Sequence, residues 1–323
     1  MEPALAPDDA VRAWLAAALR GAAESEVPAG ATQEQVLDVA DRQGAAGLVQ
    51  RRLLDLPASE PLQDAFAAAA RQQAAQSLWI AAEAKRLLNV LAEHGLRVLV
   101  LKGVALAWWL YPAPYLRVCG DLDLLYASRD DALRAARILA DHGYGEGYEQ
   151  GGHACELVRM PGPGAAYSLE VDIHWKLLNA PVFADALDFE TLWQASIAVP
   201  ALGEHARGLD AVHALCHAAM NRAVNLYTGV GDLLKCLCDI DLLAAYLDDE
   251  GWARLLRLAT DRGLCGVVHA ALEAARVDLG TQVPAQILDA MAQAMTRESL
   301  DPRRLGDWAY MQRRNAVALP LGA

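Results

Sequence analysis

The segment Gly120-Asp121-Leu122-Asp123-Leu124-Leu125 places two carboxylates two residues apart in a run of leucines. Successive side chains of a β-strand point to opposite faces, so Asp121 and Asp123 share one face while Leu122 and Leu124 share the other. Two neighbouring carboxylates repel each other unless a cation lies between them. Mg²⁺ is the expected cation, because it binds carboxylate oxygens and keeps positions open for phosphate. The segment therefore predicts a buried strand that carries a metal site.

A second acidic strand is expected at Leu169-Glu170-Val171-Asp172-Ile173-His174-Trp175. By the same alternation, Glu170, Asp172 and His174 share one face, while the apolar residues between them share the other. Asp172 is the expected third carboxylate of the metal site, and Glu170 is the alternative. Three carboxylates can hold two divalent ions about 4 Å apart, which activate an attacking hydroxyl and stabilise the leaving phosphate oxygen. His174 is expected to orient a carboxylate or to contact the substrate.

Basic residues before the acidic pair indicate a phosphate site. Lys102 follows the apolar run 97–101, which is expected to form a buried strand, and Gly103 lets the backbone approach a ligand closely. A helix is expected to begin directly after Gly103, and the free N–H groups at its start favour anions. Arg117 is a second candidate phosphate contact, because a guanidinium group binds phosphate through paired hydrogen bonds.

Length and composition indicate a globular protein with a sizeable core. The chain has 323 residues, of which 54% are hydrophobic and 21% are charged. Its net charge of −13 argues against a long nucleic acid as partner, since such a partner requires a basic surface. The six cysteines show no framework spacing, and neither a signal peptide nor a run of about 18 apolar residues is recognisable. These features predict a cytoplasmic protein with reduced thiols that does not act at a membrane.

Hydrophobic periodicity and capping residues divide the chain into three regions. Residues 1–94 are predicted to be helical, residues 95–205 to form a small α/β core, and residues 206–323 to be helical again. The predicted fold class is therefore α+β, a small mixed sheet with extensive N- and C-terminal helical segments. Predicted strands cover 97–101, 122–126, 155–160 and 167–175, the last two as a hairpin, and predicted helices cover 8–19, 33–54, 61–94, 104–110, 128–142, 211–224, 232–246, 251–262 and 284–295.

Four motifs then occur in order: Leu101-Lys102-Gly103, Arg117, Asp121-Leu122-Asp123-Leu124-Leu125 and Val171-Asp172-Ile173-His174-Trp175. Together they resemble an uncharacterised family of bacterial nucleotidyltransferases within the DNA-polymerase-β-like nucleotidyltransferase superfamily. The resemblance covers about residues 80–260. It implies a sheet with flanking helices, a divalent-metal site, and transfer of a nucleoside monophosphate from a nucleoside triphosphate with release of pyrophosphate. The superfamily's usual Gly-Ser or Gly-Gly pair is replaced by Lys102-Gly103-Val104, which is a departure from its pattern.

The resemblance implies a role for each matching residue. Asp121 and Asp123 would bind both metal ions, and Asp172 would bind the catalytic ion and draw the proton from the acceptor hydroxyl. Mg²⁺ is the implied ion, with Mn²⁺ as a substitute. The residues that would hold the triphosphate are Lys102, Gly103 and Arg117. The candidate substrate contacts are His174 and two residues at positions where such proteins often carry His and Asp, namely His217 and Asp239.

The leading functional hypothesis is a metal-dependent enzyme that uses a nucleoside triphosphate, with ATP as the expected donor. The acceptor would be a hydroxyl group of a small molecule, an aminoglycoside among the candidates, or of a peptide. The alternative is a catalytically inactive nucleotide-binding module that acts as a regulator or scaffold, with the helical regions binding a protein partner. The three carboxylates favour the enzyme, because a module that only binds nucleotide does not need all of them. The sequence does not specify the acceptor, the base or the oligomeric state.

Overall fold

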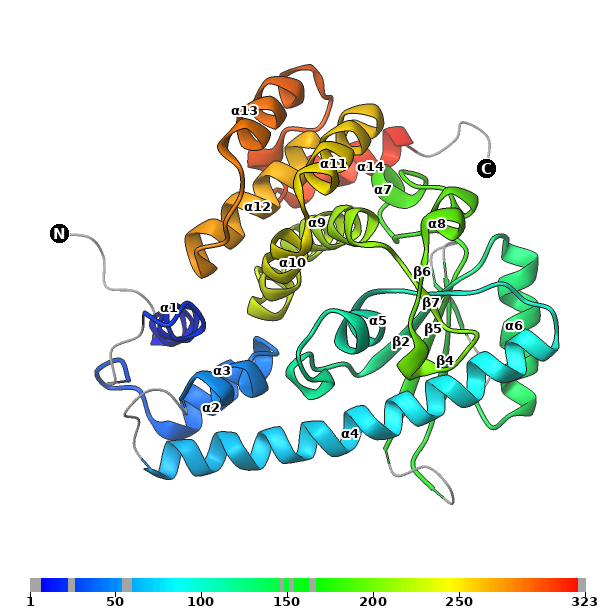
Figure 1. Ribbon diagram of the computed structural model, residues 1–323, viewed down its shortest axis with the longest axis horizontal. Helices are drawn as coiled ribbons and strands as arrows, with labels where there is room; N and C mark the ends of the chain where they lie inside the picture. Colours follow the sequence, from blue (N-terminus) through cyan, green and yellow to red (C-terminus); the bar gives the residue numbers. More distant parts are fainter. Residues whose placement is uncertain are drawn as a thin grey trace.

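The two acidic segments lie on adjacent strands of a seven-stranded mixed sheet (Figure 1). The computed structural model describes residues 7–22, 27–53, 60–145, 148–150, 154–162 and 167–318. The strands are β1 (Leu99–Val100), β2 (Asp121–Leu125), β3 (Tyr148–Gln150), β4 (Ala154–Arg159), β5 (Leu169–His174), β6 (Ile197–Ala198) and β7 (Arg207–Gly208). Their order across the sheet is β3-β4-β5-β2-β1-β7-β6. β2 is parallel to β5 and antiparallel to β1. The predicted hairpin is confirmed, because β4 and β5 pair antiparallel.

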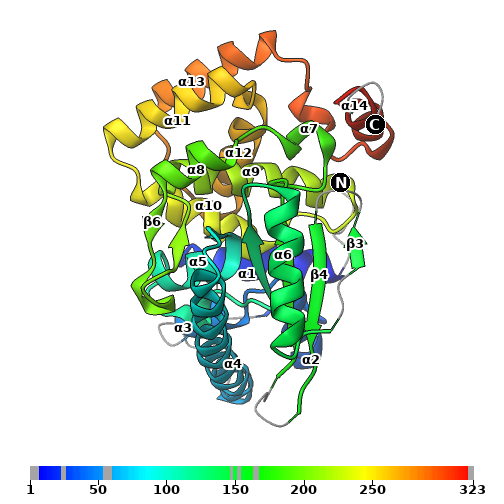
Figure 2. The same ribbon diagram turned by 90° about the vertical axis from the view of Figure 1, so that its right-hand side faces the viewer.

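Alternation along β2 and β5 separates an apolar face of the sheet from a polar one. Leu122 and Val171 belong to a buried cluster with residues of α4 (Glu60–Glu93) and α6 (Arg129–Asp141). Figure 2 shows these two helices lying across that face. The opposite face carries the acidic side chains, and its apolar residues pack with α5 (Lys102–Trp109) and α9 (Ala211–Tyr227). The polar side chains therefore lie between the sheet and the C-terminal helices.

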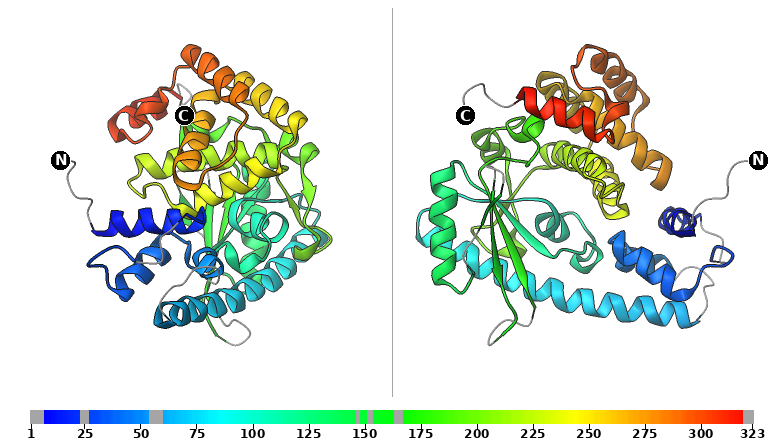
Figure 3. Two further views of the ribbon diagram at one scale, coloured as in Figure 1. Left: turned by 60° about the vertical axis from the view of Figure 1, so that its left-hand side comes forward. Right: turned by 180° about the vertical axis from the view of Figure 1, so that it is seen from behind.

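The N-terminal helices lie far from the sheet along α4, as Figures 1 and 3 show from opposite sides. They are α1 (Pro7–Leu19), α2 (Gln33–Arg42) and α3 (Ala46–Leu53). The prediction of a single helix over 33–54 is wrong. The chain turns between α2 and α3 at Gly44, whose φ of +60° is open to glycine but disfavoured for other residues. The predicted end of α4 is confirmed, since Gly95 follows it with a φ of +71°.

The chain after the sheet is helical, as predicted. Two short helices, α7 (Pro181–Ala184) and α8 (Phe189–Ala195), lie between β5 and β6. The helices after β7 are α9, α10 (Leu234–Tyr246), α11 (Asp249–Arg262), α12 (Cys265–Leu279), α13 (Ala285–Ala294) and α14 (Trp308–Ala318). The predicted α+β class with terminal helical segments is confirmed, while the exact borders of the three regions stay a prediction. In the described part of the chain, no helix combines the length and apolar character that crossing a membrane requires.

Asp210 fixes the start of α9, the helix that faces the polar side of the sheet. Its carboxylate accepts hydrogen bonds from the His213 backbone N–H at 2.9 Å, from His213 Nδ1 at 2.7 Å and from Arg254 Nη2 at 2.6 Å. Burial alone would raise the pKa of Asp210, but the hydrogen bonds of His213 and the contact with Arg254 lower this pKa to about 2. The ionised carboxylate therefore stabilises the folded protein.

We expect Asp210→Asn to lower the free energy of unfolding at pH 7 by about 1–2 kcal/mol, because the amide keeps the cap but loses the charge. The pKa is depressed in the folded state, so this contribution is present above the unfolded pKa of about 4 and is lost as pH falls towards 2. Urea unfolding of both proteins at pH 7 and pH 3 measures it. A difference that stays constant or grows at pH 3 would contradict the assignment.

Candidate active site

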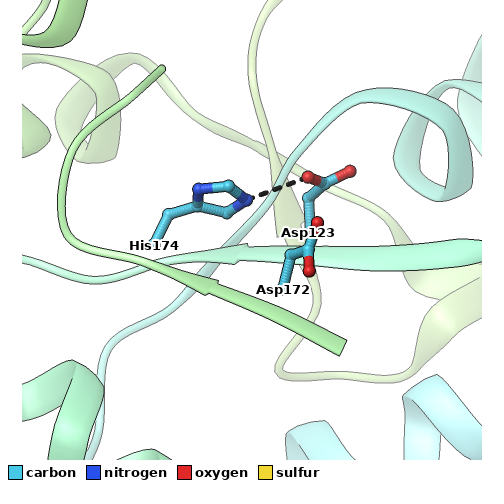
Figure 4. Close-up of side chains that lie close together, drawn as sticks. All are labelled: Asp123, Asp172 and His174. Carbon is cyan, nitrogen blue, oxygen red and sulfur yellow. Dashed lines mark hydrogen bonds and ion pairs between the residues drawn. The ribbon is translucent and has the colours of Figure 1, made fainter. Parts of the chain in front are cut away.

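Asp123 is the most buried acid of the site and has two cationic or hydrogen-bonding partners. Its side chain is 2% exposed, Lys102 Nζ donates to its Oδ1 at 2.7 Å, and His174 Nε2 lies 2.9 Å from the same oxygen (Figure 4). Burial alone would raise the pKa of Asp123, but the Lys102 charge and the His174 hydrogen bond lower it well below the usual range. Asp123 is therefore ionised and held in one orientation.

Asp172 joins Asp123 through the register of two parallel strands. Asp123 pairs with Asp172, and Leu125 pairs with His174, so the polar side chains of both strands meet on one face. Ligand atoms of Asp123, Asp172 and His174 all lie within 4.8 Å of one another. Burial, together with the negative charge of Asp123, raises the pKa of Asp172 to about 6. Two carboxylates this close repel each other when both are ionised.

The donor chemistry of this cluster fits a divalent cation. Carboxylate oxygens suit Mg²⁺ or Mn²⁺, and a cation between Asp123 and Asp172 would remove the repulsion that their proximity creates. His174 hydrogen-bonds to Asp123, and such contacts commonly orient a ligating carboxylate. The sequence hypothesis that His174 orients a carboxylate agrees with this contact, although its further role as a substrate contact stays a prediction.

Asp121 and Glu170 lie one step further along the same two strands and pair with each other. Asp121 is half-buried, and its pKa is raised by the charge of Asp123 and by burial, although Lys102 and Lys235 oppose this shift. The ligand atoms that converge come from Asp172 rather than from the exposed Glu170. Ligation of both metal ions by Asp121 stays a prediction.

Lys102 and Gly103 open α5 beside this cluster. Lys102 has a φ of +47°, the only positive φ of a non-glycine residue in the described segments. Burial alone would lower the pKa of its ammonium group, but the charge of Asp123 raises it, so Lys102 is cationic. Close packing favours glycine at position 103, because a Cβ there would lie 2.8 Å from Cys119 Sγ and 3.3 Å from Arg117 Nη1. Glycine thus lets α5 lie against the segment before β2.

Arg117 and Asp239, predicted to contact phosphate and substrate respectively, are paired with each other. Arg117 Nε and Nη2 each donate to the Asp239 carboxylate at 2.8 Å, and Nη1 donates to the Val118 carbonyl at 2.7 Å. Tyr111 also donates its hydroxyl to Asp239 Oδ1 at 2.7 Å. Both charged side chains are buried. Asp239 and the Val118 carbonyl accept from all three guanidinium nitrogens, and direct phosphate binding by Arg117 stays a prediction.

His217 lies on α9 beside Lys102. Its side chain is buried, and its Nε2 has no hydrogen-bond partner in the described residues. It lines a small cavity with Lys102, Asn221 and Asp239, whose free space of about 30 Å³ suffices for water. Burial, reinforced by the Lys102 charge, lowers the pKa of His217 to about 3, so the imidazole is neutral. Substrate contact by His217 stays a prediction, and its position beside Lys102 is compatible with it.

Comparison with known families agrees with this geometry. A family model described as an uncharacterised nucleotidyltransferase matches residues 29–280, which include every residue of the candidate site. The chain belongs to this nucleotidyltransferase family. Comparison with the curated proteins and with the solved structures gives no match. The nucleotidyltransferase is therefore an enzyme that transfers phosphorus-containing groups, and the acidic cluster on β2 and β5 is its candidate metal centre.

Proposed function

We propose that this nucleotidyltransferase moves a nucleoside monophosphate from a nucleoside triphosphate, with ATP as the expected donor, to a hydroxyl group of a small molecule or peptide. A bond forms between the acceptor oxygen and the α-phosphorus, the bond from that phosphorus to the bridging oxygen breaks, and pyrophosphate leaves. The convergence of Asp123, Asp172 and His174 beside the Lys102 ammonium group is the observation that supports this proposal.

The chain's own residues would position the reactants. Asp123 and Asp172, with Asp121 as a further ligand, would hold Mg²⁺ or Mn²⁺, which would supply charge neutralisation and activation of the hydroxyl. Asp172 would accept the hydroxyl proton, since it is less buried than Asp123. Lys102, at the N-terminus of α5, would bind the triphosphate together with the backbone at Gly103.

Three further residues shape the surroundings of the reaction. His174 would keep Asp123 oriented through its hydrogen bond. His217 would offer its Nε2 to the substrate in the cavity beside Lys102. Asp239 would act through Arg117, by fixing the segment that leads into β2, rather than by touching the nucleotide. Positioning and charge neutralisation, rather than covalent chemistry of the protein, would therefore carry the rate enhancement.

Pyrophosphate release tests the proposal. We expect release from at least one of the four common nucleoside triphosphates in the presence of Mg²⁺ and a mixture of hydroxyl acceptors that includes peptides and aminoglycosides. Release should stop on addition of EDTA and return with excess Mg²⁺ or Mn²⁺, because the carboxylates repel each other and the triphosphate without a cation. Tight nucleotide binding without release for every acceptor would instead favour the regulatory or scaffold module.

A further inference from the structure

Lys235 is a lysine of the C-terminal helices to which sequence motifs give no role. It is the second residue of α10 and is half-buried. The start of α10 is held by the turn between α2 and α3, because Leu234 N donates to Gln43 Oε1 and Lys235 N donates to the Gln43 carbonyl, both at 3.0 Å. A side chain and a carbonyl of the N-terminal helices thus satisfy the first free N–H groups of α10.

The aliphatic chain of Lys235 passes directly over Gly44. A Cβ on Gly44 would lie 2.4 Å from Lys235 Cδ and 3.1 Å from both its Cβ and its Cγ. Any other residue at position 44 would have to push the lysine aside, and the φ of +60° independently favours glycine there. The turn therefore fixes the direction of the Lys235 side chain as well as the start of its helix.

Lys235 lies on the face of α10 that borders the candidate active site. Its neighbour Cys236 lines the cavity beside Lys102, and Asp239, one turn further along the same face, lines it as well. The positive charge of Lys235 also opposes the rise in the pKa of Asp121. In the part of the chain that the structure describes, no carboxylate forms an ion pair with Lys235 and no side chain accepts a hydrogen bond from it. Lys102, the other lysine beside the acidic cluster, pairs with Asp123. Lys235 is therefore available for an anionic ligand.

We propose that Lys235 is a further cationic residue of the active site that contacts the β- and γ-phosphates of the nucleoside triphosphate, and that Gly44 and Gln43 position it. This inference depends on the proposed function for the identity of the anion. It gives the N-terminal helices a part in the reaction, since α2 and α3 then fix a phosphate-binding group supplied by α10.

Equilibrium binding of nucleotides, with EDTA present and then with Mg²⁺, tests the inference without requiring turnover. We expect Lys235→Met to weaken binding of the preferred nucleoside triphosphate and of inorganic tripolyphosphate about 10- to 100-fold, as loss of a charge-assisted contact predicts. Binding of the corresponding monophosphate should change less than about threefold, because that ligand lacks the distal phosphates. Lys235→Arg should keep most of the affinity for the triphosphate.

Gly44→Ala tests the positioning role, because it displaces the lysine without removing its charge. We expect it to weaken triphosphate binding, and we expect the double variant Gly44→Ala with Lys235→Met to bind no more weakly than Lys235→Met alone. Lys85 and Gly203 provide the matched control, since the Lys85 side chain also passes over a glycine with positive φ, Lys85 Cγ lying 3.1 Å from a Cβ built there. Lys85→Met and Gly203→Ala should leave triphosphate affinity unchanged in proteins that remain folded by circular dichroism.

The binding results test the role of Lys235 separately from the proposed nucleotidyl transfer. If the wild-type enzyme binds the triphosphate and Lys235→Met binds it equally well, Lys235 is not a phosphate contact, and the proposed function is unaffected. The same conclusion follows if monophosphate and triphosphate binding weaken by the same factor. If the wild-type protein binds no nucleoside triphosphate with or without Mg²⁺, both the inference and the proposed function are wrong.

Discussion

Asp123→Asn is expected to reduce nucleotidyl transfer by about a thousandfold or more, because the loss of a carboxylate from the candidate metal centre would remove several kcal/mol of transition-state stabilisation. The substitution keeps the size of the side chain but removes the charge that Lys102 and His174 hold in place. Asp172→Asn should have a comparable effect. The double variant should be little worse than either single variant, since the two carboxylates act as a unit.

Steady-state pyrophosphate release measures this loss, and Asp130→Asn is its matched control. Asp130 lies exposed in the first turn of α6, on the apolar side of the sheet, so its variant should keep wild-type activity. Thermal unfolding of each variant separates loss of activity from loss of the fold. Retention of a tenth or more of the wild-type rate by folded Asp123→Asn would mean that the acidic cluster is not the metal centre of the reaction.

Asp239→Ala is expected to have the largest effect on stability, lowering the free energy of unfolding by about 3–5 kcal/mol. The substitution leaves the Arg117 guanidinium buried without its counterion and leaves the Tyr111 hydroxyl without its acceptor. It also breaks the link between the segment before β2 and α10. Activity should fall as well, although only to the extent that the enzyme unfolds or β2 shifts.

Urea unfolding of three proteins tests this interpretation. Replacing both charges by apolar groups, as in Arg117→Met with Asp239→Leu, should recover much of the lost stability, because no uncompensated charge is then buried. Asp38→Ala breaks an exposed ion pair with Arg42 and should change stability little. If Asp239→Ala were as stable as wild type, the buried pair would not exist in solution.

Local signals in the sequence were sufficient to predict much of the fold. The alternation around Asp121 and Asp123 predicted β2, and Ser128 predicted the start of α6, where its hydroxyl accepts from the Asp131 N–H. Each of these features depends on neighbouring residues only. The single helix predicted over 33–54 is wrong because the helical periodicity continues on both sides of Gly44, whose positive φ separates α2 from α3.

Contacts between distant segments could not be predicted in the same way. The alternation along each strand predicted that Asp172 and His174 share a face, but the register that brings them to Asp123 required the structure. A lone arginine and a lone aspartate gave no sign that Arg117 and Asp239 would neutralise each other. Lys235 carries no motif, and only its contact with Gly44 reveals its direction.

The left-handed backbone at Lys102 has a consequence for recognising related enzymes. A residue with a Cβ in this conformation is less stable by about 1–2 kcal/mol, whereas glycine adopts it freely. Lysine nevertheless occupies this position, and its ammonium group pairs with Asp123, so the strained backbone holds a cation against the acidic cluster. Distant relatives whose motifs have diverged could therefore be screened by their dihedral angles, with a strained cationic residue at the first turn of the helix after β1 serving as the diagnostic mark.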